Sequence, residues 1–136
     1  MRSITLMARN GQLDAFMEHL NSVTWHNPIG SGRVYGMALI EARPFADHIY
    51  LQLIRSLEQG KGHGSKALHL LCTFADHYRV AIQCAAVKVG KDGLTAAELR
   101  RWYKRYGFVD SGQGYMRREP DSTPQPAPMR CRPSAQ

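Results

Sequence analysis

One stretch of the sequence restricts the possible folds more than any other: residues 51–65, which read LQLIRSLEQGKGHGS. An apolar run that ends at Leu57 is followed by three alternating glycines, and a helix-like segment then runs from Ser65 to Tyr78. Glycines allow the backbone to turn tightly, and the first N–H groups of a helix are unpaired at its positive dipole end. A strand, a glycine-rich turn and a helix start in this order therefore predict a site for a phosphorylated ligand.

Two common nucleotide-binding patterns are absent from this stretch. The P-loop pattern G-x-x-x-x-G-K-[ST] fails because Gly64 is followed by Ser65 and only then by Lys66. The dinucleotide pattern G-x-G-x-x-G fails because the glycines at 60, 62 and 64 are spaced G-x-G-x-G. The glycines alone thus leave the identity of the ligand open.

Apolar segments around this stretch predict neighbouring strands of one sheet. Arg33 to Ala42 is one predicted strand, ended by Pro44, and His48 to Leu57 is the next, joined to it as a hairpin. Because both are apolar almost throughout, we expect the sheet to be covered on both faces. Val80 to Val89 is a further buried strand. Strand, helix and strand in this order make a βαβ unit with parallel strands.

The N-terminal segment is predicted to contain one short strand and one helix. Ser3 to Ala8 fits a short strand. Asn10 is expected to cap a helix from Gly11 to Leu20, because the apolar residues of that segment recur at i, i+3, i+4 and i+7.

The C-terminal part of the predicted domain has clearer signals. Thr95 and Glu98 form a capping box that opens a helix, and Gly107 is expected to end it. The segments 108–110 and 115–118 are predicted to form a final hairpin. Residues 1–119 are thus expected to form one domain, and residues 120–136, which hold five of the seven prolines, a disordered tail.

Composition restricts the compartment and the partners. A net charge of +7 and a pI near 9.7 favour an anionic partner without distinguishing a small polyanion, a nucleic acid and an acidic protein. No apolar run reaches the roughly 20 residues of a membrane span, and the N-terminus lacks the apolar core of a secretion signal. Three cysteines, an odd number, suit reduced thiols, so we expect a cytoplasmic protein. No H-E-x-x-H or C-x-x-C pattern is present, and no metal site is expected.

Two short motifs resemble those of the GNAT acetyltransferases. Gln59, Gly62 and Gly64 match the family signature Q/R-x-x-G-x-G/A. Tyr103 and Gly107-Phe108 match the Y-x-x-x-G-F pattern at the end of the family's fourth helix, and the predicted elements between the motifs follow the family order. The chain looks most similar to the short, single-domain acetyltransferase-like proteins of phages and bacteria. The resemblance implies an α/β (α+β) fold, with a mixed, mostly antiparallel sheet whose central parallel strand pair is splayed and flanked by helices.

The resemblance also implies a set of site residues, with acetyl-CoA as co-substrate and direct transfer of its acetyl group to an amine in a ternary complex. The backbone groups of Ile54, Arg55 and Ser56 are expected to pair with the pantetheine arm and to polarise the thioester carbonyl. Tyr103 is expected to protonate the leaving thiolate, although it also fits a plain core tyrosine. The backbone of the glycine-rich loop is expected to bind the pyrophosphate; this loop comprises Gln59, Gly60, Lys61, Gly62, His63, Gly64 and Ser65.

The general base and the acceptor are left open by the sequence. The strand before the glycine-rich loop has no carboxylate in its interior, so Glu41, Asp47, His48 and an ordered water are all candidates for the base. The acceptor is an amine of a small molecule or of a protein.

Two other classes of function also stay open. One is a catalytically weak or inactive GNAT-fold module that binds CoA or a protein. The other is a small basic nucleic-acid-binding protein, which is less favoured because no reader motif is present.

Overall fold

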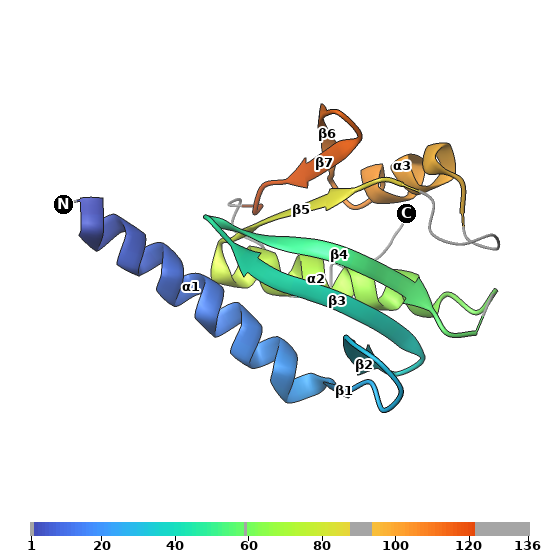
Figure 1. Cartoon of the computed structure of the whole chain (residues 1–136). Coiled ribbons are helices and arrows are strands. Elements are labelled where there is room, and N and C mark those ends of the chain that lie inside the picture. The colour runs from blue at the N-terminus through green and yellow to red at the C-terminus, as the bar shows by residue number, and fades with distance from the viewer. Residues whose placement is uncertain (1, 59, 88–93, 122–136) are drawn as a thin grey trace.

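The computed structural model of the chain describes residues 2–58, 60–87 and 94–121, and for residues 2–10 the backbone alone. Figure 1 shows the order and arrangement of the elements. They are α1 (Arg2–Val23), β1 (Trp25–His26), β2 (Arg33–Tyr35), β3 (Ala38–Phe45), β4 (His48–Ser56), α2 (His63–Tyr78), β5 (Ala81–Ala85), α3 (Ala96–Lys104), β6 (Val109–Gly112) and β7 (Tyr115–Arg118). No helix in the described part of the chain is long and apolar enough to cross a membrane.

The strands form one mixed sheet with the order β1-β2-β3-β4-β5-β7-β6. All neighbouring strands are antiparallel except β4 and β5, which are parallel and are connected by α2. This crossover is the predicted βαβ unit, and the predicted mixed α+β fold class is confirmed. The C-terminal hairpin adds β7 beside β5 and β6 at the edge. The predicted capping box at the start of α3 is also present, with Glu98 N–H donating to the Thr95 hydroxyl.

The predicted helix from Gly11 to Leu20 lies within α1, but the predictions of a strand before it and of a cap at Asn10 were wrong. Residues Ser3 to Ala8 belong to α1, which begins at Arg2 and continues through Asn10 without a cap at that residue. Four consecutive residues in this segment (Leu6 to Arg9) are strong helix formers, and a short apolar run cannot be assigned to helix or strand from periodicity alone.

The predicted strand from Arg33 to Ala42 is in fact two strands. The chain turns at Gly36 and Met37, where Gly36 has a φ of 59°, and β2 therefore pairs back onto β3. Pro44 does not end the strand, because β3 continues to Phe45. β2 pairs only with residues Ala38 to Ile40, which leaves the rest of β3 an edge strand on that side, where proline is tolerated.

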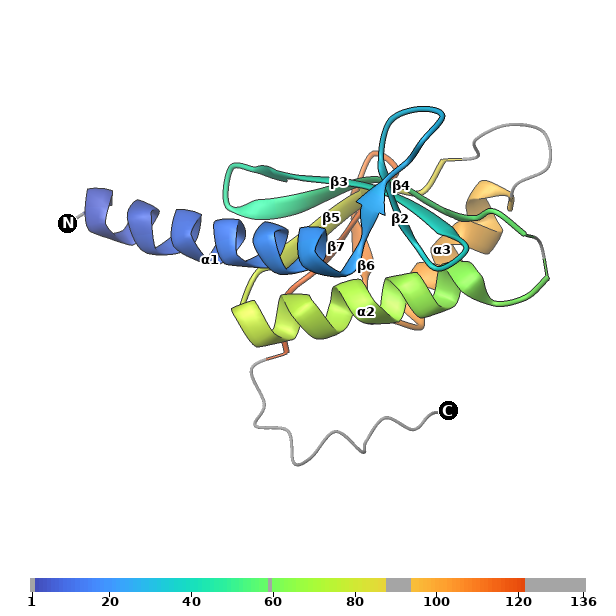
Figure 2. The same cartoon turned by 90° about the horizontal axis from the view of Figure 1, so that it is seen from below.

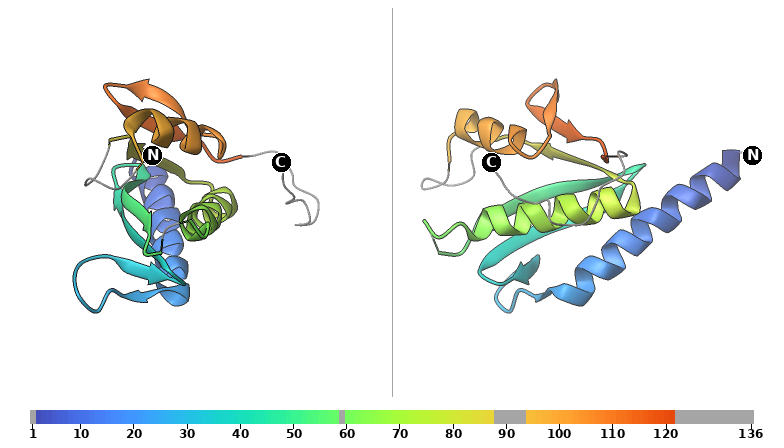
Figure 3. Two further views of the ribbon diagram at one scale, coloured as in Figure 1. Left: turned by 90° about the vertical axis from the view of Figure 1, so that its right-hand side faces the viewer. Right: turned by 180° about the vertical axis from the view of Figure 1, so that it is seen from behind.

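The helices cover one face of the sheet, which contradicts the prediction that both faces are covered. α1 and α2 pack against each other and against β3, and α3 adjoins α2 on the same side (Figures 2 and 3). The core between these layers contains Phe16 of α1, Leu68 and Leu71 of α2, and Ile40 and Ile82 of the sheet. No helix in the described part of the chain covers the opposite face, which we call the open face. Most buried residues of β3 and β4, including Ile40, Leu51 and Ile54, point to the helix side, whereas Leu39 and His48 are buried on the opposite face, which makes the two strands apolar for long stretches.

Candidate functional site

The parallel pair β4 and β5 separates part way along its length. The ladder joins His48–Leu51 to the segment Ala81–Cys84 and stops there. Beyond Leu51, β4 continues to Ser56 while it remains paired with β3 on its other side. The last part of β4, which includes Ile54, Arg55 and Ser56, therefore has no ladder partner on the β5 side in the described part of the chain. Backbone groups at this edge are available to another extended chain or ligand.

A β-bulge lies where the two strands separate. Glu41 of β3 pairs with Leu53, and the next residue, Ala42, pairs with Leu51, so Gln52 is an extra residue in β4. The bulge reverses the alternation of side chains, and Ile54 is consequently directed to the helix side, where it is buried. Bulges bend a strand and increase its twist, which accounts for the divergence of β4 from β5.

The glycine-rich loop leads from the free end of β4 to the start of α2. Gly60 and Gly62 adopt φ values of 77° and 74°, a region that favours glycine. Gly62 is the N-cap of α2, and no side chain caps the helix there. A Cβ added at Gly60 or Gly62 would meet nothing within 4 Å, so the space in front of the helix start is open. Gln59, the first residue of the predicted signature, lies outside the described residues.

Trp102 of α3 contacts the first turn of α2. The indole N–H of Trp102 donates to the Ser65 hydroxyl at 2.9 Å. Gly64 is buried between this ring and the end of β4: a Cβ at Gly64 would lie 3.7 Å from the Ser56 amide nitrogen and 3.7 Å from the Trp102 ring. The structure thus brings the last residue of β4 and the start of α2 together.

The charges around the loop are of mixed sign. Lys61 and Lys66 are exposed, and the uncapped N-terminus of α2 adds the positive end of its dipole. Glu58 is the nearest carboxylate in sequence, and its Oε1 lies 3.4 Å from His63 Nε2. His63 thereby holds the acidic side chain at the edge of the loop. The open space, the uncapped N–H groups and the two lysines fit a phosphate or pyrophosphate group.

Tyr103 lies on α3 at the point where β4 and β5 separate. Its side chain is 5% exposed, and its hydroxyl lies next to the thiol of Cys84, the last β5 residue of the parallel ladder. Burial, and next the proximity of Cys84, raises the pKa of Tyr103 far above its usual value of 10.0. Burial likewise raises the pKa of Cys84 to about 12. At neutral pH both groups are protonated, so the phenol can donate a proton but the thiol is not a nucleophile.

The three candidate bases occupy different places. Glu41 is half-buried on the open face beside the bulge, and its Oε2 accepts a hydrogen bond from Ser31 at 2.8 Å. His48 is the first residue of β4 and Asp47 precedes it, and the ladder residue Leu51 is three residues beyond His48, or roughly 10 Å at about 3.3 Å per residue. The structure therefore places Glu41 near the separation of the strands and the other two away from it.

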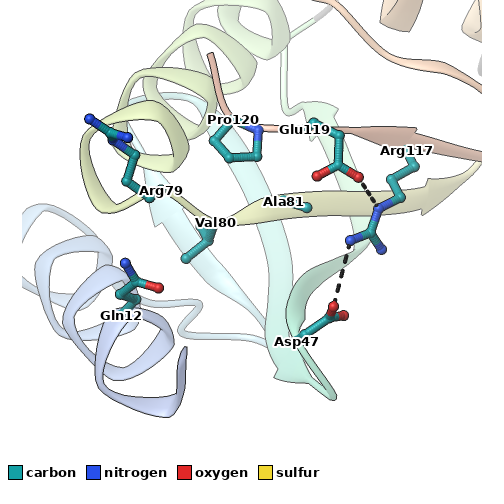
Figure 4. Close-up of a pocket in the computed structure, with 8 residues that line it drawn as sticks. All are labelled: Gln12, Asp47, Arg79, Val80, Ala81, Arg117, Glu119 and Pro120. Carbon is teal, nitrogen blue, oxygen red and sulfur yellow. Dashed lines mark hydrogen bonds and ion pairs between the residues drawn. The ribbon is translucent and has the colours of Figure 1, made fainter. Parts of the chain in front are cut away.

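Asp47 instead lines a pocket at the far end of the sheet (Figure 4). There the Arg117 guanidinium lies between two carboxylates, 3.9 Å from Asp47 Oδ2 and 2.6 Å from Glu119 Oε2. The hydrogen bond from His48, and to a smaller extent Arg117, lowers the pKa of Asp47. This low pKa and the ion pair with Arg117 make Asp47 a poor proton acceptor.

Three features of the site were not found from the sequence: the Gln52 bulge, the Trp102–Ser65 contact and the Tyr103–Cys84 contact. The two contacts join segments far apart in the chain, and the bulge depends on how β3 pairs with β4, so no local sequence pattern predicts any of them. In the described part of the chain, no group of three or more His, Cys, Asp or Glu side chains is placed to hold a metal ion.

Comparison with known proteins supports the fold. No family model matches the sequence, and no curated protein matches it. Among solved structures, the chain is similar to the crystal structure of the anti-CRISPR protein AcrVA5, with a TM-score of 0.53 and 16% sequence identity. The match covers 62% of this chain and 92% of AcrVA5. At this level of identity the similarity concerns the arrangement of the helices and strands.

Proposed function

We propose that the protein is an acetyl-CoA-dependent N-acetyltransferase that transfers an acetyl group to an amine by direct attack in a ternary complex. One juxtaposition carries the proposal. The free edge of β4 begins beyond Leu51, where β4 separates from β5 and where Tyr103 lies next to Cys84, and it ends at Ser56, which packs against the start of α2. The fold and the two sequence motifs agree with this assignment.

The residues of the chain have distinct proposed tasks. The N–H groups of His63, Gly64 and Ser65 at the start of α2 would bind the pyrophosphate, with Lys61 and Lys66 adding positive charge. The free backbone edge from Ile54 to Ser56 would hold the pantetheine arm, and one of its N–H groups would stabilise the negative charge that develops on the carbonyl oxygen. Bound acetyl-CoA supplies a thioester whose acetyl carbon an amine can attack.

Tyr103 would act as the general acid toward the leaving thiolate. Its buried phenol keeps its proton at any physiological pH; because the raised pKa makes it a weak acid, it would release that proton only as negative charge develops on the leaving sulfur. On the other side, the amine must lose a proton before it attacks. Glu41, or a water that it orients, is the best-placed acceptor of that proton, because Glu41 adjoins the bulge on the open face.

Two measurements test the proposal. Thermal melting with acetyl-CoA should show binding, equivalent to about 2.7 kcal/mol of stabilisation at roughly 100 times Kd. Release of free thiol with a panel of amines should then show turnover, and Tyr103→Phe should lower turnover more than acetyl-CoA affinity. No stabilisation by any acyl-CoA would refute CoA binding, and an equal loss of both parameters in Tyr103→Phe would remove the acid assignment.

A second candidate is a GNAT-like module that binds CoA without turnover. The observation that favours it is the burial of Tyr103, whose hydroxyl lies next to Cys84 inside the core. Under this alternative, acetyl-CoA raises the melting temperature but no amine in the panel gives thiol release. The third class, a nucleic-acid-binding protein, is supported only by the overall charge of +7.

A further inference from the structure

The open face of the sheet is rich in aromatic and arginine side chains. Directly opposed residues of neighbouring strands share a face, and the registers place side chains from six strands on this one. These include Trp25, Arg43, Phe45, Tyr50, Arg55 and Tyr115. Trp25 is 58% exposed and Phe45 61% exposed. None of the lysines in the described part of the chain lies on this face.

This composition is that of a protein-binding surface. Aromatic residues and arginine are enriched in protein–protein interfaces, whereas lysine is depleted. Trp, Tyr and Arg are also the residues that most often dominate the binding energy. Exposed aromatic side chains on a face without covering helices are a further sign of an interaction site.

The charges on the open face argue against nucleic acid as its partner. Three arginines (Arg43, Arg55 and Arg117) are balanced by three carboxylates (Glu41, Asp47 and Glu119). Binding to a phosphate backbone requires an excess of positive charge at the contact surface. The net charge of the chain instead arises elsewhere, for example from the exposed Lys61 and Lys66 at the start of α2 and from the arginines of α3. A protein with both acidic and basic side chains complements a balanced face.

The width of the open face indicates whether its partner is a small molecule or a macromolecule. From Trp25 on β1 to Tyr115 on β7 there are five strand spacings, or roughly 24 Å at about 4.8 Å each. A typical protein–protein interface buries about 800 Å² on each partner, a patch of comparable width. Small ligands are instead enclosed in concave pockets. The aromatic side chains are therefore too widely spread for one small amine to contact them together.

The open face also adjoins the reacting centre. Glu41 and Leu53 lie on it directly beside the Gln52 bulge, where β4 leaves β5. We propose that the acceptor amine is carried by a folded protein that docks on the open face and presents a lysine side chain to the separation between β4 and β5. This inference rests on the proposed acetyltransferase function and names its class of acceptor.

The experiment compares acceptor pools from one cell extract, using the full chain and acetyl-CoA labelled in its acetyl group. The pools are the dialysed native proteins, the same proteins after tryptic digestion, the small-molecule filtrate and the purified nucleic acids. We expect the label in the native-protein pool, at least tenfold less in the digest, and label that resists nuclease but not protease. Label that enters the filtrate or the nucleic acids instead would overturn the proposal.

Substitutions on the open face test whether protein labelling depends on this surface. The combined substitution Trp25→Ala, Arg43→Glu and Tyr115→Ala should lower protein labelling at least tenfold while stabilisation by acetyl-CoA is retained. Arg43→Glu alone should lower it severalfold, which provides a test if the combined variant folds poorly. Arg79→Glu, at an exposed arginine at the end of α2, is the matched control and should label as the wild type does.

The outcomes separate this inference from the proposed function. Stabilisation by acetyl-CoA without label in the native-protein pool overturns the docking proposal and leaves CoA binding intact. Neither stabilisation nor label overturns both. Equal labelling by the open-face variants and the control also overturns the docking proposal, as does a homodimer that the open-face variants dissociate without a change in labelling.

Discussion

The indole N–H of Trp102 on α3 donates to the hydroxyl of Ser65 on α2 at 2.9 Å. This bond joins residues 37 positions apart and fixes α3 against the first turn of the helix that follows the glycine-rich loop. The ring also lies against Gly64, which packs on the end of β4. Three parts of the candidate site thus meet at one tryptophan side chain.

Trp102→Phe should test the contribution of this bond. The substitution keeps an aromatic ring but removes the donor, and one neutral hydrogen bond contributes about 1 kcal/mol to the free energy of unfolding. We expect a loss of that size by urea denaturation, and a similar loss in Ser65→Ala. If the bond is the cause, the double variant should be less destabilised than the sum of the two single variants. Additive losses would contradict the coupling.

Gly62→Ala and Gly64→Ala form a second, matched pair. Gly62 has a φ of 74°, so alanine there is strained by about 1–2 kcal/mol, and its methyl group would project into the open space in front of α2. Gly64 has ordinary helical geometry, and a methyl group at 3.7 Å from its neighbours is in normal contact. We expect Gly62→Ala to lower both stability and acetyl-CoA affinity, and Gly64→Ala to retain both.

Thermal melting with and without acetyl-CoA measures both quantities for this pair. If Gly62→Ala bound acetyl-CoA as tightly as the wild type, the open space before α2 would not be the phosphate site. A large loss of stability in Gly64→Ala would show that the contact between α2 and β4 is tighter than the distances indicate.

Much of the fold follows from local signals in the sequence. The capping box at Thr95 and Glu98, the glycine-rich turn before α2 and the βαβ order were all evident, because each depends on residues close together in the chain. The exceptions have physical causes. Ser3 to Ala8 is apolar enough for a strand, but the strong helix formers from Leu6 to Arg9 overlap it, and Gly36 turns a segment whose composition is continuous.

The site was less predictable than the fold. The glycines with positive φ follow from their spacing, but the side chains that support them do not. Gln52 forms a bulge because Glu41 pairs with Leu53 and Ala42 with Leu51, which leaves Gln52 without a partner on β3. Cys84 and Tyr103 come into contact only when α3 packs on the sheet. The open face was missed because long apolar strands indicate burial without showing that one face remains uncovered.

Arg118 provides a test of how the C-terminal hairpin is attached. Its guanidinium makes two hydrogen bonds to the Asp76 carboxylate of α2, at 2.8 and 3.0 Å, and donates to the Tyr106 carbonyl at 2.7 Å. The side chain of Arg118 is 11% exposed and that of Asp76 28% exposed, so removing Arg118 leaves a partly buried carboxylate with the Asp121 N–H as a remaining donor. Arg118→Leu should therefore cost about 3 kcal/mol of the free energy of unfolding, the upper range for hydrogen bonds to a charged group.

The matched control for Arg118 is Arg117→Leu on the same strand. The guanidinium of Arg117 pairs with Glu119, which is 69% exposed, and exposed pairs contribute at most about 1 kcal/mol. The loss in free energy of unfolding, measured by urea denaturation, should be several-fold larger in Arg118→Leu than in Arg117→Leu. Equal losses would contradict a special role for the buried pair with Asp76.

The buried thiols predict how stability changes at alkaline pH. Burial raises the pKa of Cys72 and of Cys84 from 9.0 to about 12, so the folded protein keeps two protons that the unfolded chain loses first. Between about pH 9 and 12 the folded state binds more protons, and the free energy of unfolding must fall as pH rises, by up to about 1.4 kcal/mol per pH unit for each thiol. Below pH 9 both states hold these protons and no such dependence arises from them. Urea unfolding at a series of alkaline pH values, under reducing conditions, measures the slope. In the double variant Cys72→Ala/Cys84→Ala, the slope of the free energy of unfolding against pH should lose the contribution of the two thiols and keep the contribution of Tyr103. An unchanged slope would show that the thiols are not the groups that titrate.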